Sequence, residues 1–154
     1  MEEIEQLEFD VRMLDRRITH AQVERERIKD QLFTARKDQG WLSLMHAEYE
    51  SAACRTPKYL AFHRTFKREF TKLLKDNFDI AEIEIAKPNH FDASGFFRLT
   101  NGNVYYISVG DLRWAKTFMI RKAKDFKDYT GEANNMLNTE DFDAFMSGLK
   151  SVVR

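Results

Sequence analysis

The dipeptide Asn101-Gly102 constrains the fold more than any other feature of this sequence. It lies between two apolar and aromatic runs, and an Asn-Gly pair in that setting is the strongest short-range signal of a β-hairpin. Both faces of such a hairpin would carry large apolar side chains, which a sheet with one solvated face does not need. Either helices cover both faces, or one face is a binding surface. A two-residue loop predicts the cross-strand pairs Leu99 with Val104, Phe97 with Tyr106, Phe96 with Ile107, and Arg98 with Tyr105.

Two helices are predicted around this hairpin. Thr56 followed by Pro57 is a typical helix start, because threonine caps free N–H groups and proline suits the first turn. The apolar stripe that follows predicts a helix over 57–77. A second stripe, with acidic residues in its first turn, predicts a helix over 139–152.

Two further strands are predicted from the sequence. Apolar and acidic residues alternate over 80–86, and a mixed apolar and basic run follows the hairpin at 117–123. Together with the hairpin they give a four-stranded, mainly antiparallel sheet packed with helices, so the predicted class is α+β. This domain is expected over 57–154, after a connector over 40–56.

The first 39 residues carry a heptad pattern. Apolar side chains recur at alternating spacings of three and four, and no glycine or proline interrupts them before Gly40. This narrow stripe is typical of a helix that pairs with another helix, so a coiled-coil helix is predicted over 1–39. The alternative is an amphipathic helix lying on its own domain. The predicted oligomer interface consists of Ile4, Leu7, Val11, Leu14, Ile18, Ala21, Ile28 and Leu32.

The charges beside the stripe favour an antiparallel homodimer. In a parallel pair Glu3 would face Glu8, Asp10 would face Asp15, and Arg25 would face its own copy. In an antiparallel pair that sets Ile4 opposite Ala35, opposite charges meet instead. These contacts are Glu8 with Lys29 and Arg17 with Glu24, while Arg25 lies opposite Leu14.

The charge balance excludes two classes of protein. Lysine and arginine number 25 and aspartate and glutamate also number 25, so the net charge is zero. A protein that binds nucleic acid over its whole surface is strongly basic and a DNA mimic is strongly acidic, so neither class fits. The charge is nevertheless segregated, because residues 58–77 and 113–127 are net basic.

Composition also predicts the compartment. A single cysteine, Cys54, excludes a disulfide within the chain and a cysteine-rich zinc site, and it suits a reducing environment. The N-terminus is acidic, unlike a signal peptide, and no apolar run approaches membrane-spanning length. A cytoplasmic protein with no membrane partner is expected.

The sequence predicts no enzyme. The four histidines lack the spacing of metal ligands and the six glycines are isolated, so no metal, cofactor or catalytic residue is expected. A metal-dependent nuclease is the one alternative that the carboxylates suggest. Against it, alternation assigns both strand glutamates to solvent, and the spacing to the lysine is one residue too long. Its residues would be Glu82, Glu84, Lys87 and Asp111.

A basic run interleaved with aromatic residues follows the hairpin. Cations beside aromatic planes suit a single-stranded or structured nucleic acid, and they equally suit a contact that holds an acidic protein. A third interpretation is that the aromatic residues are core and the charges are ordinary surface. The predicted binding patch consists of Arg113, Trp114, Arg121, Lys124 and Lys127.

The run YYISVGDLRW, followed by IRKAKDFKDYTGEANN, resembles a segment of small accessory proteins of bacterial phages and conjugative elements. The resemblance covers about residues 60–135. It implies a protein of a mobile genetic element, for which blocking a host defence complex is a plausible activity, and it carries over no catalytic residue.

Two functions are expected on these grounds. The first is a non-enzymatic binding protein that engages a nucleoprotein complex, with inhibition of a host defence nuclease (anti-CRISPR type) as its activity. The second is a direct nucleic-acid-binding accessory factor of a phage or plasmid. Affinity for naked nucleic acid separates the two, because only the second requires it.

Overall fold

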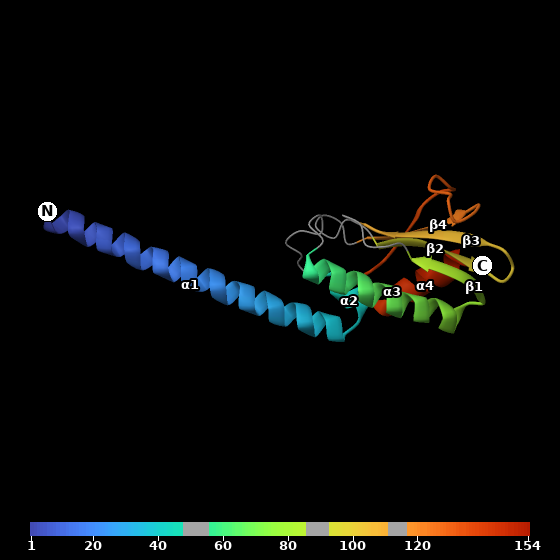
Figure 1. Cartoon of the computed structure of the whole chain (residues 1–154), viewed down its shortest axis with the longest axis horizontal. Helices are drawn as coiled ribbons and strands as arrows, with labels where there is room; N and C mark the ends of the chain where they lie inside the picture. Colours follow the sequence, from blue (N-terminus) through green and yellow to red (C-terminus); the bar gives the residue numbers. More distant parts are fainter. Residues whose placement is uncertain (48–55, 86–92, 111–116) are drawn as a thin grey trace. The chain divides into compact units, whose positions relative to one another are not determined.

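The chain is described by a computed structural model that covers residues 1–47, 56–85, 93–110 and 117–154 (Figure 1). It divides into two units, Met1–Ala35 and Arg36–Arg154. The first unit is helical, and the second, called the folded unit below, combines helices with an antiparallel sheet. The predicted α+β class with a long N-terminal helix is confirmed.

The elements follow one another along the chain as the apolar periodicities suggest, with one short helix inside the predicted connector. The helices are α1 (Glu2–Asp38), α2 (Trp41–Met45), α3 (Pro57–Asn77) and α4 (Phe142–Val152), and the strands are β1 (Ile80–Ile85), β2 (Ala93–Leu99), β3 (Val104–Val109), β4 (Phe118–Ala123) and β5 (Asn135–Leu137).

Side-chain caps fix where two of the helices begin. The Thr56 side chain accepts a hydrogen bond from the backbone N–H of Tyr59 at the start of α3. At α4 the Asp141 carboxylate accepts one from Ala144, at 2.7 Å. Asp141 is therefore the cap, and α4 begins three residues later than the sequence predicts.

The sheet has five strands in the order β1-β2-β3-β4-β5, and every neighbouring pair is antiparallel. The predicted number of four is wrong because β5 is only three residues long. Its first residue, Asn135, belongs to an Asn-Asn pair that signals a loop. Pairing with β4, which sets Leu137 opposite Phe118, makes this segment a strand.

The hairpin lies where the sequence predicts it, but its loop has three residues, Thr100–Gly102. The N–H of Gly102 donates to the carbonyl of Leu99 at 3.0 Å, and the N–H of Leu99 donates to Asn103 at 2.9 Å. Gly102 has a φ of +92°, as a turn followed by one left-handed residue requires. All four predicted pairs are wrong by one residue. The observed pairs include Phe96 with Tyr106, Phe97 with Tyr105, and Arg98 with Val104.

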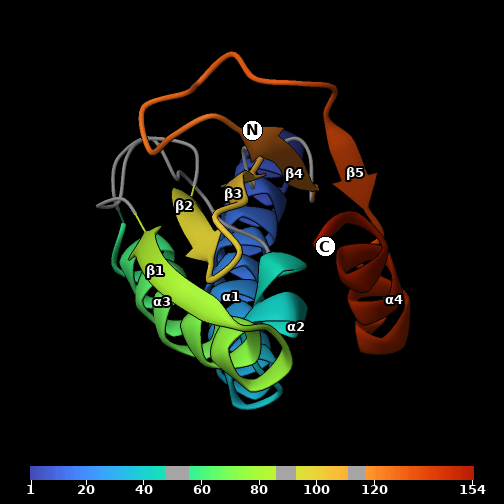
Figure 2. The ribbon, with the colours of Figure 1, turned by 90° about the vertical axis from the view of Figure 1, so that its right-hand side faces the viewer.

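The two faces of the sheet are covered differently. The helices α3 and α4 lie on one side, the inner face, and the chain between β4 and β5 rises on the other, the outer face (Figures 1 and 2). On the inner face the Phe118 ring contacts Trp41 of α2, Phe66 of α3 and Phe145 of α4, with centroids 5.0–6.4 Å apart. Among the described residues, helices thus cover the inner face and a loop covers the outer face.

The helix α1 has no buried residue along its length. All eight residues of the predicted oligomer interface are exposed, as are Phe9, Met13 and Val23 elsewhere on the helix. Taken by itself, α1 thus buries none of its apolar stripe.

Candidate functional site

The outer face of the sheet carries an aromatic cluster. Phe96 of β2 and Tyr106 of β3 face each other at 4.9 Å between ring centroids. Two rings from residues 124–131, called the cap loop below, lie against them. Phe126 stacks on Phe96 at 5.6 Å, and Tyr129 meets both Phe96 and Tyr106 edge-on at 5.4 and 5.8 Å. The cap loop is thereby packed on the sheet through its aromatic side chains.

Asp128 organises the cap loop through its carboxylate. One oxygen accepts from the N–H of Lys124 at 2.9 Å, and the other accepts from Thr130 at 3.1 Å and Gly131 at 2.8 Å. Led by the Lys124 hydrogen bond, these contacts and the charge of Arg121 lower the pKa of Asp128 from 3.8 to about 2. The loop is thus held by an ionised carboxylate at neutral pH.

Arg121 supports the cap loop from below. Its guanidinium donates to the carbonyls of Asp128 at 2.7 Å and Lys122 at 3.3 Å, and it lies over the Tyr106 ring at 4.6 Å. A Cβ atom at Gly131 would stand 1.7 Å from this guanidinium, so the loop passes too close for any larger residue. Arg121 is a structural cation in this arrangement.

The predicted binding patch is therefore corrected in one member. Arg121 is only 2% exposed, so it is not available as a contact residue. Lys124 and Lys127 are exposed on the cap loop, so their side chains are accessible to a partner. Arg113 and Trp114 lie outside the described residues.

Tyr129 is the residue of this surface that sequence reasoning did not select. It is 68% exposed although its ring contacts two rings of the sheet, and it lies in the same loop as the two lysines. Tyr129 stands between Asp128 and Gly131 in the sequence, and both of these residue types favour turns, so the turn itself was a usable signal. Beside it, Arg98 lies over Phe126 at 5.1 Å and pairs with Glu82 at 3.3 Å.

The cap loop carries an exposed aromatic ring, Tyr129, and exposed lysine side chains on a backbone that is held by hydrogen bonds. Between 121 and 131 there are four basic and two acidic residues, and both acidic side chains accept hydrogen bonds from backbone N–H groups. Lysine heads can therefore neutralise an anionic partner while the tyrosine supplies a stacking or anchoring surface. The chemistry of these side chains suits binding.

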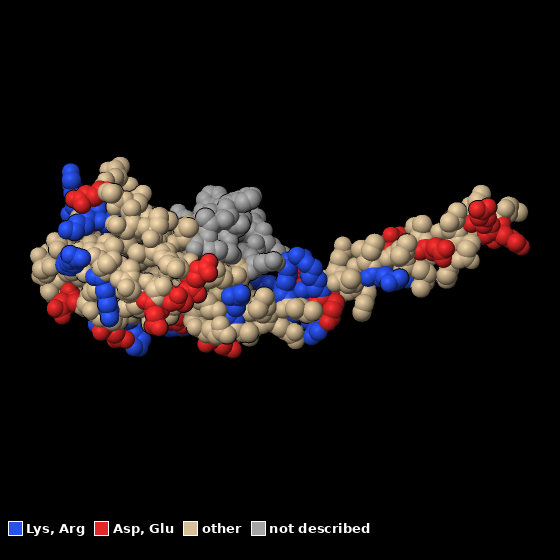
Figure 3. All heavy atoms as spheres, turned by 180° about the vertical axis from the view of Figure 1, so that it is seen from behind, with Lys and Arg blue, Asp and Glu red and all other residues tan. Residues whose placement is uncertain are grey.

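The basic face of α3 is an ordinary charged helix surface. Arg64, Arg68, Lys72 and Lys75 are exposed, but Arg68 pairs with Glu69 at 2.9 Å and Lys72 pairs with Asp76. Seen from behind, basic and acidic side chains lie side by side over the folded unit (Figure 3). Such exposed pairs contribute little and do not single out a partner.

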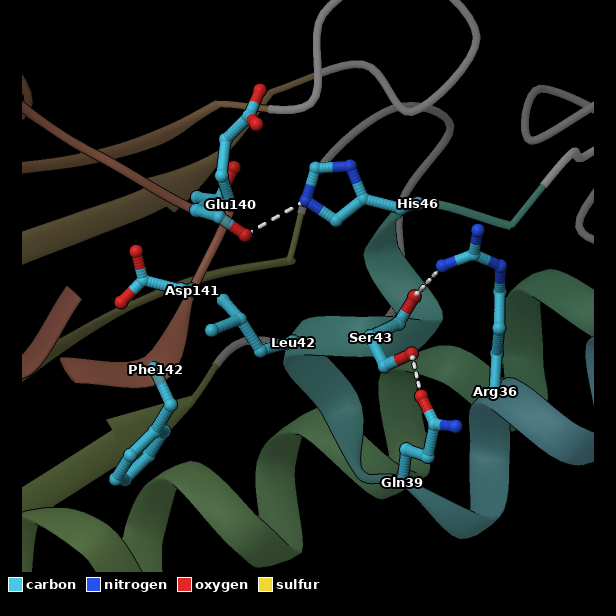
Figure 4. A pocket seen from close by; sticks show the side chains of 9 residues that line it. Arg36, Gln39, Leu42, Ser43, His46, Glu140, Asp141 and Phe142 are labelled. Carbon is cyan, nitrogen blue, oxygen red and sulfur yellow. Dashed lines mark hydrogen bonds between the residues drawn. The ribbon is translucent and has the colours of Figure 1, made fainter. Parts of the chain in front are cut away.

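A pocket of about 530 Å³ lies beside α2 and the start of α4 (Figure 4). His46 is hydrogen-bonded to the carbonyl of Thr139 at 2.8 Å, and the Ser43 hydroxyl donates to Gln39 at 3.0 Å. Arg36 donates to the Ser43 carbonyl at 3.3 Å. These groups tie residues 36–46 together and to the segment before α4, so their hydrogen bonds serve the fold.

The residues suggested for a nuclease are only partly described. Glu82 and Glu84 are exposed on β1, and Glu82 is paired with Arg98. Lys87 and Asp111 lie outside the described residues. Within the described ranges, no three His, Cys, Asp or Glu side chains are close enough to hold a metal ion. Nor does any helix in those ranges have the length and apolarity to cross a membrane.

Comparison with known proteins found no matching family model, no matching curated protein and no matching solved structure.

Proposed function

We propose that the chain is a non-enzymatic binding protein of a mobile genetic element, and that it engages a nucleoprotein complex through the cap loop on the outer face of its sheet. Inhibition of a host defence nuclease is the activity that such binding would serve. The resemblance of residues 60–135 to accessory proteins of phages and conjugative elements supports the setting, and the cap loop supports the mode of binding.

One observation carries the proposal: an exposed tyrosine is packed on the sheet in the same loop as two exposed lysines. Tyrosine is among the residues that contribute most to binding energy at protein interfaces, because its rigid ring loses little conformational entropy on binding. Tyr129 is already fixed by its contacts with Phe96 and Tyr106. Lys124 and Lys127 would steer the surface towards an acidic protein or an exposed phosphate backbone.

The second candidate is direct binding of nucleic acid by an accessory factor of a phage or plasmid. The exposed Tyr129 ring, in a loop that also carries exposed lysines, favours it, because single strands bind on aromatic rings flanked by cations. The two candidates differ in affinity for naked oligonucleotides. Fluorescence anisotropy with labelled single-stranded DNA and RNA, at low and at physiological salt, separates them.

The main experiment measures phage plating on bacterial strains that each carry one CRISPR nuclease directed against the phage. The parent protein is expected to restore plaques in at least one strain. The combined change Tyr129→Ala and Lys127→Glu should abolish the restoration, because an anchor ring is worth about 2 kcal/mol, or about thirtyfold in affinity.

Two control variants match the exposure of the altered residues. Met136→Ala removes another exposed apolar side chain, and Lys150→Glu reverses another exposed lysine on α4. Both should restore plaques like the parent. Failure of the parent in every strain contradicts the inhibitor function, and full activity of the Tyr129 variant contradicts the binding surface.

A further inference from the structure

The apolar stripe of α1 is not buried within its own helical unit, Met1–Ala35. Ten large apolar side chains between Ile4 and Leu32 are exposed, and seven of them lie on the heptad stripe. Side chains on that stripe are 47–62% exposed. A helix whose apolar residues are arranged so narrowly is suited to knobs-into-holes packing against a second helix.

We propose that the occupant of this surface is a second copy of the same helix, running antiparallel, with Ile4 of one copy opposite Ala35 of the other. This inference is independent of the function proposed above, because it concerns α1 alone. Three features of the sequence support it: the sizes of the facing side chains, the position of Arg25, and the flanking charges.

Side-chain size favours this register over a parallel one. The stripe contains two small residues, Ala21 and Ala35. In a parallel pair each alanine would face its own copy and leave the layer underfilled. In the antiparallel register each alanine faces an isoleucine, and each of the remaining layers joins two side chains larger than alanine. The layers are Ile4 with Ala35, Leu7 with Leu32, Val11 with Ile28, Leu14 with Arg25, and Ile18 with Ala21.

Arg25 is the only charged residue on the stripe. In a parallel pair the two guanidinium groups would meet at one layer, where like charges repel. In the antiparallel register Arg25 lies opposite Leu14, so its aliphatic stem can cover the leucine while the guanidinium stays in water. The charge then specifies the register without being buried.

The flanking charges agree with the same register. Glu8 of one copy lies beside Lys29 of the other, and Arg17 lies beside Glu24, so each contact occurs twice. Within the helix Arg27 already donates to Glu24 at 2.9 Å, and this hydrogen bond lowers the pKa of Glu24. Glu24 is therefore ionised at neutral pH and can be shared with Arg17 of the other copy.

The pair would give one particle two binding surfaces. The two copies of Ala35, where the folded units begin, would lie at opposite ends of the paired helices, about 45 Å apart at 1.5 Å per residue. A partner with two sites at a compatible spacing would be bound with increased avidity.

Sedimentation equilibrium of the full chain tests whether the pair forms. We expect a dimer, and we expect Val11→Asp to raise its dissociation constant at least about a hundredfold, because a carboxylate would enter the apolar seam. The matched control is Val23→Asp, the same change on the opposite side of the helix at a residue of 66% exposure. It should shift the constant by less than about threefold. A monomer at all concentrations, a larger oligomer, or equal effects of the two changes would overturn the proposal.

Disulfide formation tests the orientation, in a chain whose Cys54 is replaced by serine. Ile4→Cys and Ala35→Cys chains are oxidised separately and as a mixture. The mixture should give the mixed disulfide, and each chain alone should give little. Efficient crosslinking of the Ile4→Cys chain to itself would show a parallel pair and overturn the orientation.

A charge reversal is an independent test, because it should change the stability of the dimer in opposite directions for the two orientations. Glu8→Lys should weaken the antiparallel dimer, since the introduced lysine would face Lys29 of the other copy. In a parallel dimer the same change would relieve the contact with Glu3. Adding Lys29→Glu should restore the antiparallel dimer. A tighter dimer after Glu8→Lys alone would contradict the proposal.

Discussion

In the helix α1 no side chain is buried, whereas the folded unit encloses Trp41, Phe66, Phe118 and Phe145 in one cluster of rings. Both regions contain many apolar residues, so apolar content alone does not explain the difference. The difference is where the complementary surface lies. Residues of the folded unit find theirs on other elements of the same unit, whereas the occupant proposed for the α1 stripe is a second copy of the helix.

The comparison also separates two kinds of stability. Burial within the folded unit does not depend on protein concentration, whereas burial of the α1 stripe would follow mass action. Substitutions in the two regions should therefore differ in size and in their dependence on concentration.

The largest expected effect is truncation of a core ring. Phe66 is fully buried and lies 5.1 Å from the Trp41 ring and 5.2 Å from the Phe70 ring. Phe66→Ala should reduce the free energy of unfolding of the folded unit by about 3–5 kcal/mol, measured by urea denaturation. Phe9→Ala on α1 is the matched control and should change it by less than about 0.5 kcal/mol. Equal effects would remove the contrast between the regions.

The second effect concerns Arg121, which joins the sheet to the cap loop. Arg121→Met keeps much of the stem over Tyr106 but leaves the carbonyls of Asp128 and Lys122 without their donor. It should cost about 2–3 kcal/mol of unfolding free energy. Lys124→Met, at an exposed neighbour, should cost less than about 0.5 kcal/mol. A tolerated Arg121→Met would mean that the guanidinium does not support the loop.

The third effect tests the hairpin loop. A Cβ atom at Gly102 would meet nothing within 4 Å, so the cost of Gly102→Ala is that of the left-handed backbone alone. It should be about 1–2 kcal/mol. Gly102→Asn should cost less, because asparagine tolerates this conformation better than alanine. Thermal melts of the three proteins, with the order Gly, Asn, Ala, would confirm the positive φ.

The smallest effect is a pH dependence in the cap loop. The pKa of Asp128 in the folded chain is about 2, below its ordinary value of 3.8, so the unfolded state binds a proton first as the pH falls. The contribution of Asp128 to stability is complete above about pH 4 and is lost towards pH 2. Asp128→Asn should show a smaller loss over this interval in acid-dependent urea melts. An identical pH profile would contradict the assigned role of the carboxylate.

Local sequence patterns correctly predicted the elements that are determined by residues close together in the chain. The heptads indicated α1, Thr56-Pro57 indicated the start of α3, and the Asn-Gly pair indicated the hairpin. The failures depend on contacts distant in sequence. The short strand β5 exists through its pairing with β4, and Arg121 is buried because residues 128–131 fold back over it.

The hairpin register failed for a subtler reason. Thr100 could have belonged to the strand or to the loop, and the choice moves every cross-strand pair by one residue. Gly102 takes the left-handed conformation in either case. The Asn-Gly pair therefore indicated the turn correctly, but it did not determine whether the loop has two or three residues.

Hydrogen exchange at two protein concentrations, followed in α1 and in the strands β2 and β3 of one sample, tests the contrast between the regions most directly. The account predicts that α1 amides become more protected as concentration rises, because pairing stabilises the helix, while the hairpin amides exchange at unchanged rates. Protection of α1 that is the same at both concentrations, below and above the measured dimer dissociation constant, would contradict it.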